Sequence, residues 1–585
     1  MLAISQDRWG GSVLEMWCKL LIIISLTMRL ALCNIPTDPM KNKSTSTVGR
    51  FNLSSSSKCL TALILSTLNL QLLTFGQGSL TPPGAPAPTM KTLAQIEPRT
   101  PISSLPVTLS QPGAYYLTTN LTYTGGDGIT VTATNVTIDL NGFALKGAGT
   151  NSTANGINSS GSCLMLRHGT IAGWLYGVMS SGPNNKIENV VFSSGSIAGG
   201  GVELFAGGNT VVGCNFENCG YGVYSAGSGD AILDCVVSGA SESEAIGINV
   251  GAGCTVSRCT VSGGQGIGIA AYAATISHCT AEGNLLGGIE GLESLIIGCT
   301  TAHNGGDGID SNGSCTIRDC AASYNAANGI GASGADCVIK DCTAGHNSAA
   351  GISAAVSCTI AGCNASYNTG GGITAGTGCT LIGCNVTSNL SAGISLGDDS
   401  VVKDCTVRGN SGAGLSTGNH LVASGCTLAS NAGAGLTGGL VCKVADCVLV
   451  LNTGFGVILL AHGQVTGCHV NANTSGGVRV AGDSLVRDNM IDFHQTLTTT
   501  PGISVTGSAN RIEANNVTRS GRGLDVTGTG NAITRNTVSG STLNYNIVAG
   551  NNVGTIVQAT LSGAIAGSTG GAGLGTTDPW ANFSY

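Results

Sequence analysis

CTAGHNSAAGI at 342–352, CNASYNTGGGI at 363–373 and CNVTSNLSAGI at 384–394 are consecutive copies of one motif. Each copy has a Cys, an Asn five residues later, and a Gly-aliphatic pair that begins four residues after the Asn. The motif recurs about every 21 residues from Cys299 to Asn473. A period of this length is typical of solenoid repeats, in which each copy stacks on the last. We therefore expect a stack of near-identical coils.

The composition fits a solenoid better than a set of globular domains. Of 585 residues 92 are Gly, and only 9% are charged, against about 25% in typical soluble proteins. Strong helix formers such as Glu, Lys and Gln are scarce, which argues against helical repeats. The formal net charge is -7 and no Lys/Arg cluster occurs, so we expect neither nucleic acid nor an anionic membrane as a partner.

The 24 Cys residues mostly follow the repeat period. In CTIRDC (315–320) and CVIKDC (337–342) two Cys lie five residues apart, which is not the two-residue gap of zinc sites. We interpret them as buried, small apolar side chains. Parallel side-chain directions on stacked coils suit a disulfide poorly, but the sequence alone leaves their redox state open.

The N-terminal part differs from the repeats. Residues 40–78 have a basic start, a short apolar run and a small polar exit, and are interpreted as a signal peptide. Residues 1–39 would then be a start-site artefact. The alternative is an uncleaved membrane anchor, although the apolar run at 59–75 is short and contains polar residues. Residues 79–104 are Pro-rich and are expected to be a linker.

Each repeat contains three short β-type segments, which are TLI, NVT and GISL within residues 379–396. Such short segments can satisfy their backbone groups by pairing in parallel with the next coil. We expect an all-β, single-stranded right-handed parallel β-helix of roughly 20 coils over residues 105–560, with a C-terminal cap or tail at 561–585. Beyond Cys468 the Cys position is expected to be taken by Asn489, Asn516 and Asn536.

Three side-chain ladders follow from the superposition of coils. Two are aliphatic, one through Ile317, Ile339, Ile360 and Leu381, the other through Ile309, Ile330, Ile352, Ile373 and Ile394. The third contains the recurring Asn, whose amide can bond both the local backbone and the next Asn.

The pattern C/N-T-I-x-x-C/N-x-x-x-x-N-x-x-x-G-I resembles the repeat of pectin-lyase-like right-handed β-helix proteins and is similar to the NosD-type β-helix domain. QPGAYYLTTNLT (111–122) and VTIDLNGFALKG (136–147) resemble the entry coils of such proteins. The resemblance implies the fold over roughly residues 105–560. It leaves the function open, because this fold includes polysaccharide lyases, epimerases, tailspikes and adhesins.

One candidate catalytic patch lies on the turn before the Cys. Asp319 and Asp341 occupy the same position of consecutive coils, each preceded by a base, Arg318 or Lys340. Superposed turns would place the two carboxylates about 5 Å apart, as an acid/base pair or a cation site. The alternative is a solvated turn, since Asp also recurs singly at 234, 404 and 446.

A second candidate site is the position just before the ladder Asn. It is aromatic in four consecutive coils, at His303, Tyr324, His346 and Tyr367. We interpret these four residues as a carbohydrate-binding strip. The alternative is an ordinary turn position that tolerates many residues.

These observations favour an exported cell-surface, periplasmic or secreted protein that is non-catalytic and binds glycans or mediates adhesion. A polysaccharide lyase, hydrolase or epimerase is the main alternative. Enzymes of this kind need several acids and bases in one place, and this chain offers only the patch of Arg318, Asp319, Lys340 and Asp341. A periplasmic copper-related accessory protein is a second alternative. We expect no cofactor, no metal site and no cytosolic partner.

Overall fold

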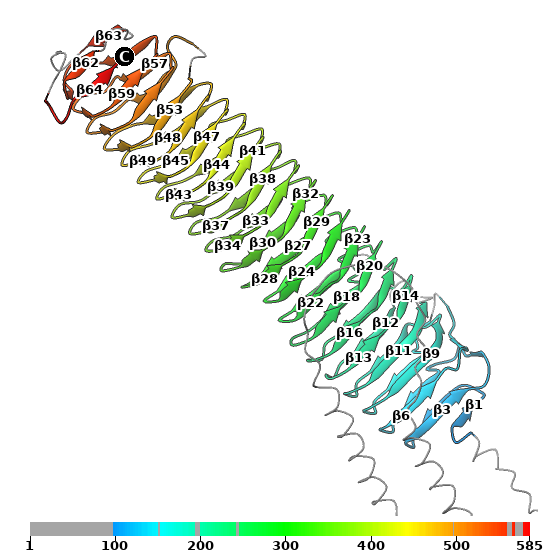
Figure 1. Ribbon diagram of the computed structural model, residues 1–585. Coiled ribbons are helices and arrows are strands. Elements are labelled where there is room, and N and C mark those ends of the chain that lie inside the picture. The colour runs from blue at the N-terminus through cyan, green and yellow to red at the C-terminus, as the bar shows by residue number, and fades with distance from the viewer. Residues whose placement is uncertain are drawn as a thin grey trace, which may run out of the picture. The chain divides into compact units, whose positions relative to one another are not determined.

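A computed structural model describes residues 97–149, 152–193, 199–241, 245–494, 497–558, 564–567 and 577–585. The expected start-site artefact and signal peptide, and most of the expected linker, lie outside these residues. The described chain is an all-β solenoid of about 21 turns (Figure 1). Its strands run from β1 (Thr100–Ile102) to β64 (Asn582–Ser584). This confirms the predicted fold class.

A representative turn contains β37 (Thr380–Ile382), β38 (Asn385–Thr387) and β39 (Ile394–Leu396), the three segments predicted from the repeat. Each pairs in parallel with its counterpart one coil on, in β40 (Val401–Lys403), β41 (Thr406–Arg408) and β42 (Leu415–Thr417). The first two strands of every turn lie in one large sheet, called sheet A here, and the third strands stack separately as sheet B.

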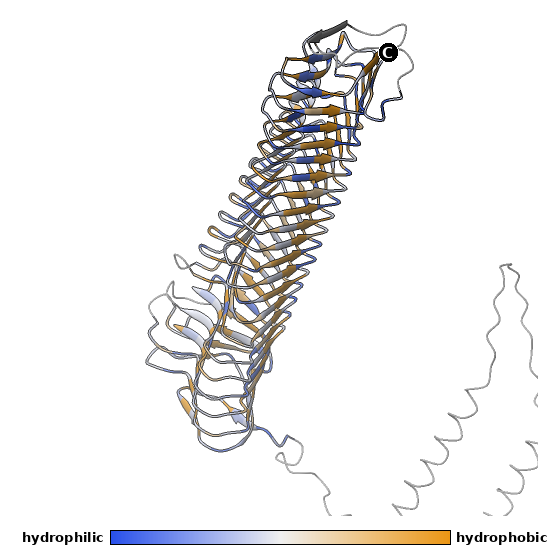
Figure 2. Ribbon diagram, turned by 90° about the vertical axis from the view of Figure 1, so that its left-hand side faces the viewer, coloured by the Kyte–Doolittle hydropathy of each residue, from blue (hydrophilic) through white to orange (hydrophobic). Residues whose placement is uncertain are grey.

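Alternation along each short strand places the core. In β37 and β38 the central Leu381 and Val386 are fully buried while their flanking residues reach the surface, as period-two side-chain alternation requires. The predicted aliphatic ladders both form, because Ile317, Ile339 and Ile360 pair in register and so do Ile309, Ile330 and Ile352. In Figure 2 the hydrophobic residues line up from turn to turn along the stack.

The predicted Asn ladder is continuous and buried from Asn284 to Asn473. At Asn368 the backbone N–H and the side-chain Nδ2 both donate to Oδ1 of Asn389, at 3.0 and 2.9 Å. Nδ2 also donates to the carbonyl of Ala344 at 3.1 Å. One side chain therefore satisfies backbone groups of the preceding coil and links neighbouring coils.

The Cys residues of the repeat form buried columns, and none of the Cys that the structure describes forms a disulfide. Sγ of Cys363 lies 3.4 Å from the carbonyl oxygen of Ala361, within reach of a weak hydrogen bond. Burial raises the pKa of Cys315 and Cys442, as desolvation does for any thiol. The columns stabilise the coils by packing and not by covalent cross-links.

One predicted position in this column is wrong by a single residue. Cys468 N–H donates to Asn489 Oδ1, and Nδ2 of Asn489 donates to Oδ1 of Asn515, both at 2.9 Å. Asn515, not Asn516, therefore takes the Cys position, while Asn516 begins strand β56 (Asn516–Thr518) and is exposed. The coil before it is longer, with 26 residues between ladder positions, so counting by the period fails there.

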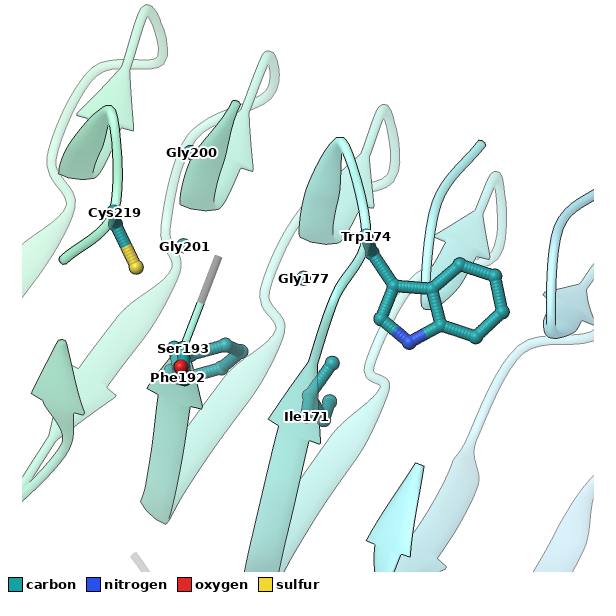
Figure 3. A pocket seen from close by; sticks show the side chains of 8 residues that line it. All are labelled: Ile171, Trp174, Gly177, Phe192, Ser193, Gly200, Gly201 and Cys219. Carbon is teal, nitrogen blue, oxygen red and sulfur yellow. The ribbon is translucent and has the colours of Figure 1, made fainter. Parts of the chain in front are cut away.

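The N-terminal coils enclose large aromatic side chains. Phe192 and Phe216 stack with ring centroids 4.9 Å apart, and Gly201 in β12 (Gly200–Leu204) lies against Phe216. Figure 3 shows Ile171, Phe192 and Cys219 inside successive turns, with Gly177 and Gly201 close by. The gap between them cannot hold a water molecule. It is a feature of packing rather than a ligand site.

None of the described residues forms a helix with the length and hydrophobicity needed to cross a membrane.

Candidate functional site

The aromatic residues singled out in the sequence form one column on the outside of sheet A. Each follows the second strand of its turn, and each has a positive φ between 55 and 60°. This left-handed conformation ends the strand and turns the side chain outward, beside the buried Asn that follows it. The four residues are His303, Tyr324, His346 and Tyr367.

The rings stack face to face along the column. Ring centroids are 5.2 Å apart for His303–Tyr324, 4.8 Å for Tyr324–His346 and 5.1 Å for His346–Tyr367, with planes within 6° of parallel. Coil spacing sets these distances, which fall in the range of favourable aromatic pairs. At the lower end, Nδ1 of His303 lies 3.4 Å from Glu282 Oε1.

Stacking decides which surfaces a ligand can reach. Both faces of Tyr324 and of His346 are covered by their neighbours, so along the column only ring edges meet solvent. Tyr367 is different, because the next positions of the column are Ser388 and Gly409. No ring of the described residues stacks on its upper face, and Tyr367 is 58% exposed, against 53% for Tyr324.

The predicted acid/base patch lies on a different turn of sheet A. Arg318 and Lys340 pair in register at the ends of β28 (Thr316–Arg318) and β31 (Val338–Lys340). Asp319 and Asp341 follow them in left-handed turns, with φ of 56 and 52°. The structure thus brings all four residues together.

These four side chains project into solvent. Lys340 Nζ lies 3.6 Å from Asp341 Oδ2, and the two side chains are 58% and 51% exposed. Ion pairs of this exposure contribute little, about 0–1 kcal/mol. The geometry matches the solvated-turn alternative at least as well as an acid/base pair.

A cluster of carboxylates on sheet B was missed by sequence reasoning. Glu290 and Asp310 pair in register on β24 (Ile289–Leu292) and β27 (Ile309–Asn312). With Asp307 they border a hollow of about 230 Å³ whose remaining lining includes Ile267 and Leu286. We call this the acidic hollow. The signal was the residue after each Gly-Ile pair, which is acidic in two consecutive coils.

The carboxylates of the acidic hollow have different surroundings. Asp307 Oδ1 accepts the backbone N–H of Asn328 at 2.7 Å. Burial, followed by the nearby charges of Asp307 and Glu290, raises the pKa of Asp310. A carboxyl group whose protonated form is favoured, beside two others, is an arrangement that can donate a proton.

Among the described residues no three His, Cys, Asp or Glu side chains converge as metal ligands.

A protein-family model described as "right handed beta helix region" matches overlapping stretches at 200–336, 244–381, 309–439 and 354–494. No curated protein gives a significant match. Similar solved structures include the mannuronan C-5 epimerase AlgE4 A-module of Azotobacter vinelandii, at 12% identity, covering 59% of this chain and 87% of that one, with a TM-score of 0.22.

Two others are a mutant of the periplasmic alginate epimerase AlgG and tailspike protein 3 of bacteriophage CBA120. The first is 10% identical, over 70% of this chain and 77% of that one, with a TM-score of 0.21. The second is 13% identical, over 64% and 57%, with a TM-score of 0.22. At these identities the likenesses concern the fold alone.

Proposed function

The chain belongs to the right-handed β-helix family, and we propose that it is a non-catalytic protein that binds glycans through the aromatic column. The observation that carries this proposal is the ring face of Tyr367 that no other described ring covers, at the end of the stack. Aromatic rings bring large contact area at low entropic cost and recur in small-molecule sites.

The surroundings of Tyr367 suit a sugar ring. The negative face of an aromatic ring attracts the weakly positive C–H groups of a pyranose face. Ser366, Thr387 and Ser388, all partly exposed, place hydroxyl groups near the rim. Such hydroxyls can bond the equatorial oxygens of a sugar, whereas a purely apolar ligand would leave them without partners.

The stack also fixes the direction of the glycan. A pyranose on Tyr367 lies parallel to the ring planes of the column, which are within 6° of one another. Equatorial glycosidic bonds leave a sugar roughly in its own plane, so the polymer crosses the solenoid instead of following it. Tyr367 is then a single-sugar subsite.

Two tyrosines of one column give a matched test. Tyr367→Ala removes the open face, while Tyr324→Ala leaves it in place above His346. In affinity electrophoresis against neutral glucans, mannans, xylans and galactans, Tyr367→Ala should weaken retention about tenfold, the equivalent of about 1.4 kcal/mol. Tyr324→Ala should change it less than threefold. Equal losses would favour binding by ring edges along the strip, and no retention of any polymer would reject the function.

A polysaccharide hydrolase is the second candidate, because the pKa of Asp310 is raised beside Glu290 and Asp307. Glycoside hydrolysis needs one protonated and one ionised carboxyl group on either side of the scissile bond. Reducing-end release from the same polymers should then fall at least 100-fold in Asp310→Asn and Glu290→Gln. Asp404→Asn, on an exposed turn of sheet A, is the control. Absence of activity in the unmodified protein would remove this candidate.

We also propose that the protein is exported, on the strength of the signal-like residues 40–78. N-terminal sequencing of the mature protein tests this, and a mature chain that begins before Met40 would contradict it.

A further inference from the structure

A second hollow, of about 320 Å³, lies on sheet A towards the C-terminal end of the stack. It is formed over β49 (Gln464–Thr466), β52 (Leu485–Arg487) and β55 (Arg511–Glu513) and the turns that precede them. Its polar lining differs from that of the acidic hollow, because arginine and histidine contribute to it. The charged and amide side chains of the lining are His462, Gln464, Asp483, Arg487, Arg511 and Glu513.

A buried carboxylate holds one of these arginines in place. Glu513 is only 4% exposed. Its Oε2 lies 2.7 Å from Nε of Arg511, and its Oε1 lies 3.2 Å from Nη1 of Arg535. Both carboxylate oxygens are thus engaged, and the guanidinium of Arg511 is oriented before any ligand arrives.

Arg487 pairs with an exposed carboxylate and is held less firmly. Its Nε lies 3.0 Å from Asp488 Oδ2. In both arginines Nε makes the contact with the carboxylate, and each guanidinium carries further N–H donors on its Nη atoms that can bind a ligand. Leu485 pairs with Arg511 and Arg487 with Glu513, which sets the two arginines diagonally, roughly 8 Å apart at Cα.

We propose that this hollow binds a single oxyanion, a sulfate, phosphate or carboxylate group, between Arg487 and Arg511. Planar guanidinium forks match such groups, and charge-assisted bonds to them are about twice as strong as neutral ones. His462 and Gln464 add donors at the rim. The site is separate from Tyr367 and from the acidic hollow, and it does not depend on the proposed function.

One lining carboxylate opposes the anion. Asp483 is exposed and follows His462 by one coil in the same turn column, and unlike Glu513 it pairs with no arginine among the described residues. Removing its charge should therefore strengthen anion binding. This gives the proposal a variant that gains affinity, which loss of folding cannot imitate.

Calorimetric titration of the full chain at low ionic strength tests the proposal, with inorganic sulfate, inorganic phosphate and a monomeric uronic acid as separate probes. We expect at least one probe to bind. Arg487→Gln should weaken that binding about tenfold, and Asp483→Asn should strengthen it about threefold. Lys403→Gln is the matched control, since Lys403 ends an equivalent strand of sheet A and its charge lies outside the hollow.

The probes also separate the sources of the anion. Binding of the uronic acid alone indicates a carboxylated glycan, and binding of sulfate or phosphate indicates an esterified ligand. Equal losses in Arg487→Gln and Lys403→Gln would show nonspecific attraction and overturn the proposal. Failure of all three probes, or weaker binding in Asp483→Asn, would overturn it as well.

Discussion

At the scale of single residues, the buried amides and the exposed rings of this protein use the same coil spacing for different purposes. An Asn in the ladder can reach the next Asn because the coils lie about 4.8 Å apart. The rings of the aromatic column stack for the same reason. The amides lie inside and satisfy backbone groups, whereas the rings lie outside and leave one face open. Burial therefore separates a structural ladder from a candidate binding column.

Replacement of one ladder amide should be costly. Asn368→Ala leaves the backbone N–H and Nδ2 of Asn347, which both donate to Asn368 Oδ1 at 3.0 Å, without their acceptor. Each unsatisfied buried group costs about 1–3 kcal/mol, so we expect a loss of about 3 kcal/mol in urea denaturation. Asn385→Ala, at an exposed strand position, should change stability by less than about 0.5 kcal/mol. Similar effects of the two substitutions would contradict this role of the ladder.

The ladder ends at a buried histidine, which should make stability depend on pH. Nδ1 of His494 accepts the backbone N–H of Asn473 at 3.1 Å. Burial lowers the pKa of His494, so the folded state disfavours its protonation relative to the unfolded chain. Stability should then be complete above pH about 6.5 and fall as the pH drops, by at most about 1.4 kcal/mol per pH unit.

Thermal unfolding between pH 5 and 8 measures this dependence of stability on pH. His494→Asn restores a neutral ladder amide and should flatten the curve, whereas His469→Asn, at an exposed position, should leave its slope unchanged. A slope that persists in His494→Asn would show that other groups are responsible.

At the scale of the element, what could be predicted depended on whether a feature follows the repeat period. Strands, aliphatic ladders and the Asn ladder follow it, so residues such as Leu381 and Asn389 were placed correctly. Asn515 was missed because a longer coil precedes it. Glu290 and Asp310 share one column of the repeat and could have been found there, whereas Asp307 lies on a turn whose proximity to them depends on folding. Arg487 and Arg511 lie at diagonal positions of neighbouring coils. They belong to different columns of the repeat, so a reading of one column at a time does not bring them together.

Strand β12 should tolerate no side chain at Gly201. A Cβ there would lie 2.2 Å from Cδ1 of Phe216 and 2.7 Å from the carbonyl oxygen of Gly222. We expect Gly201→Ala to destabilise the protein by about 1–3 kcal/mol, measured by urea denaturation. Phe216→Leu in the same chain should recover part of that loss by making room. A double variant as unstable as the sum of both single variants would show that this contact is not the cause.

At the scale of the whole molecule, stability is the sum of turns and their interfaces, because each coil contacts only its neighbours. Most strand pairs join one coil to the next, as in β38 and β41. The exception is at the C-terminal end, where β64 pairs with both β59 (Thr537–Ser539) and β62 (Ile556–Gln558).

The hollow that contains Arg487 and Arg511 lies in coils separate from the aromatic column and the acidic hollow. The last two share a coil, because His303 follows β26 (Thr300–Ala302) and Asp310 lies on β27 of the same turn. Function at the arginine hollow can therefore change without loss of the other two.

Deletion of one whole repeat tests this independence. Removal of residues 384–404 joins Gly383 to Cys405 and brings Asn368 onto Asn410 in the ladder, so every column keeps its register. We expect a folded protein with the circular dichroism of β-structure, shortened by about 4.8 Å, and small-angle scattering can measure the change. Removal of residues 384–394 breaks the period and turns apolar side chains outward, so it should yield aggregated protein. Equal folding of both deletions would mean that register does not hold this solenoid together.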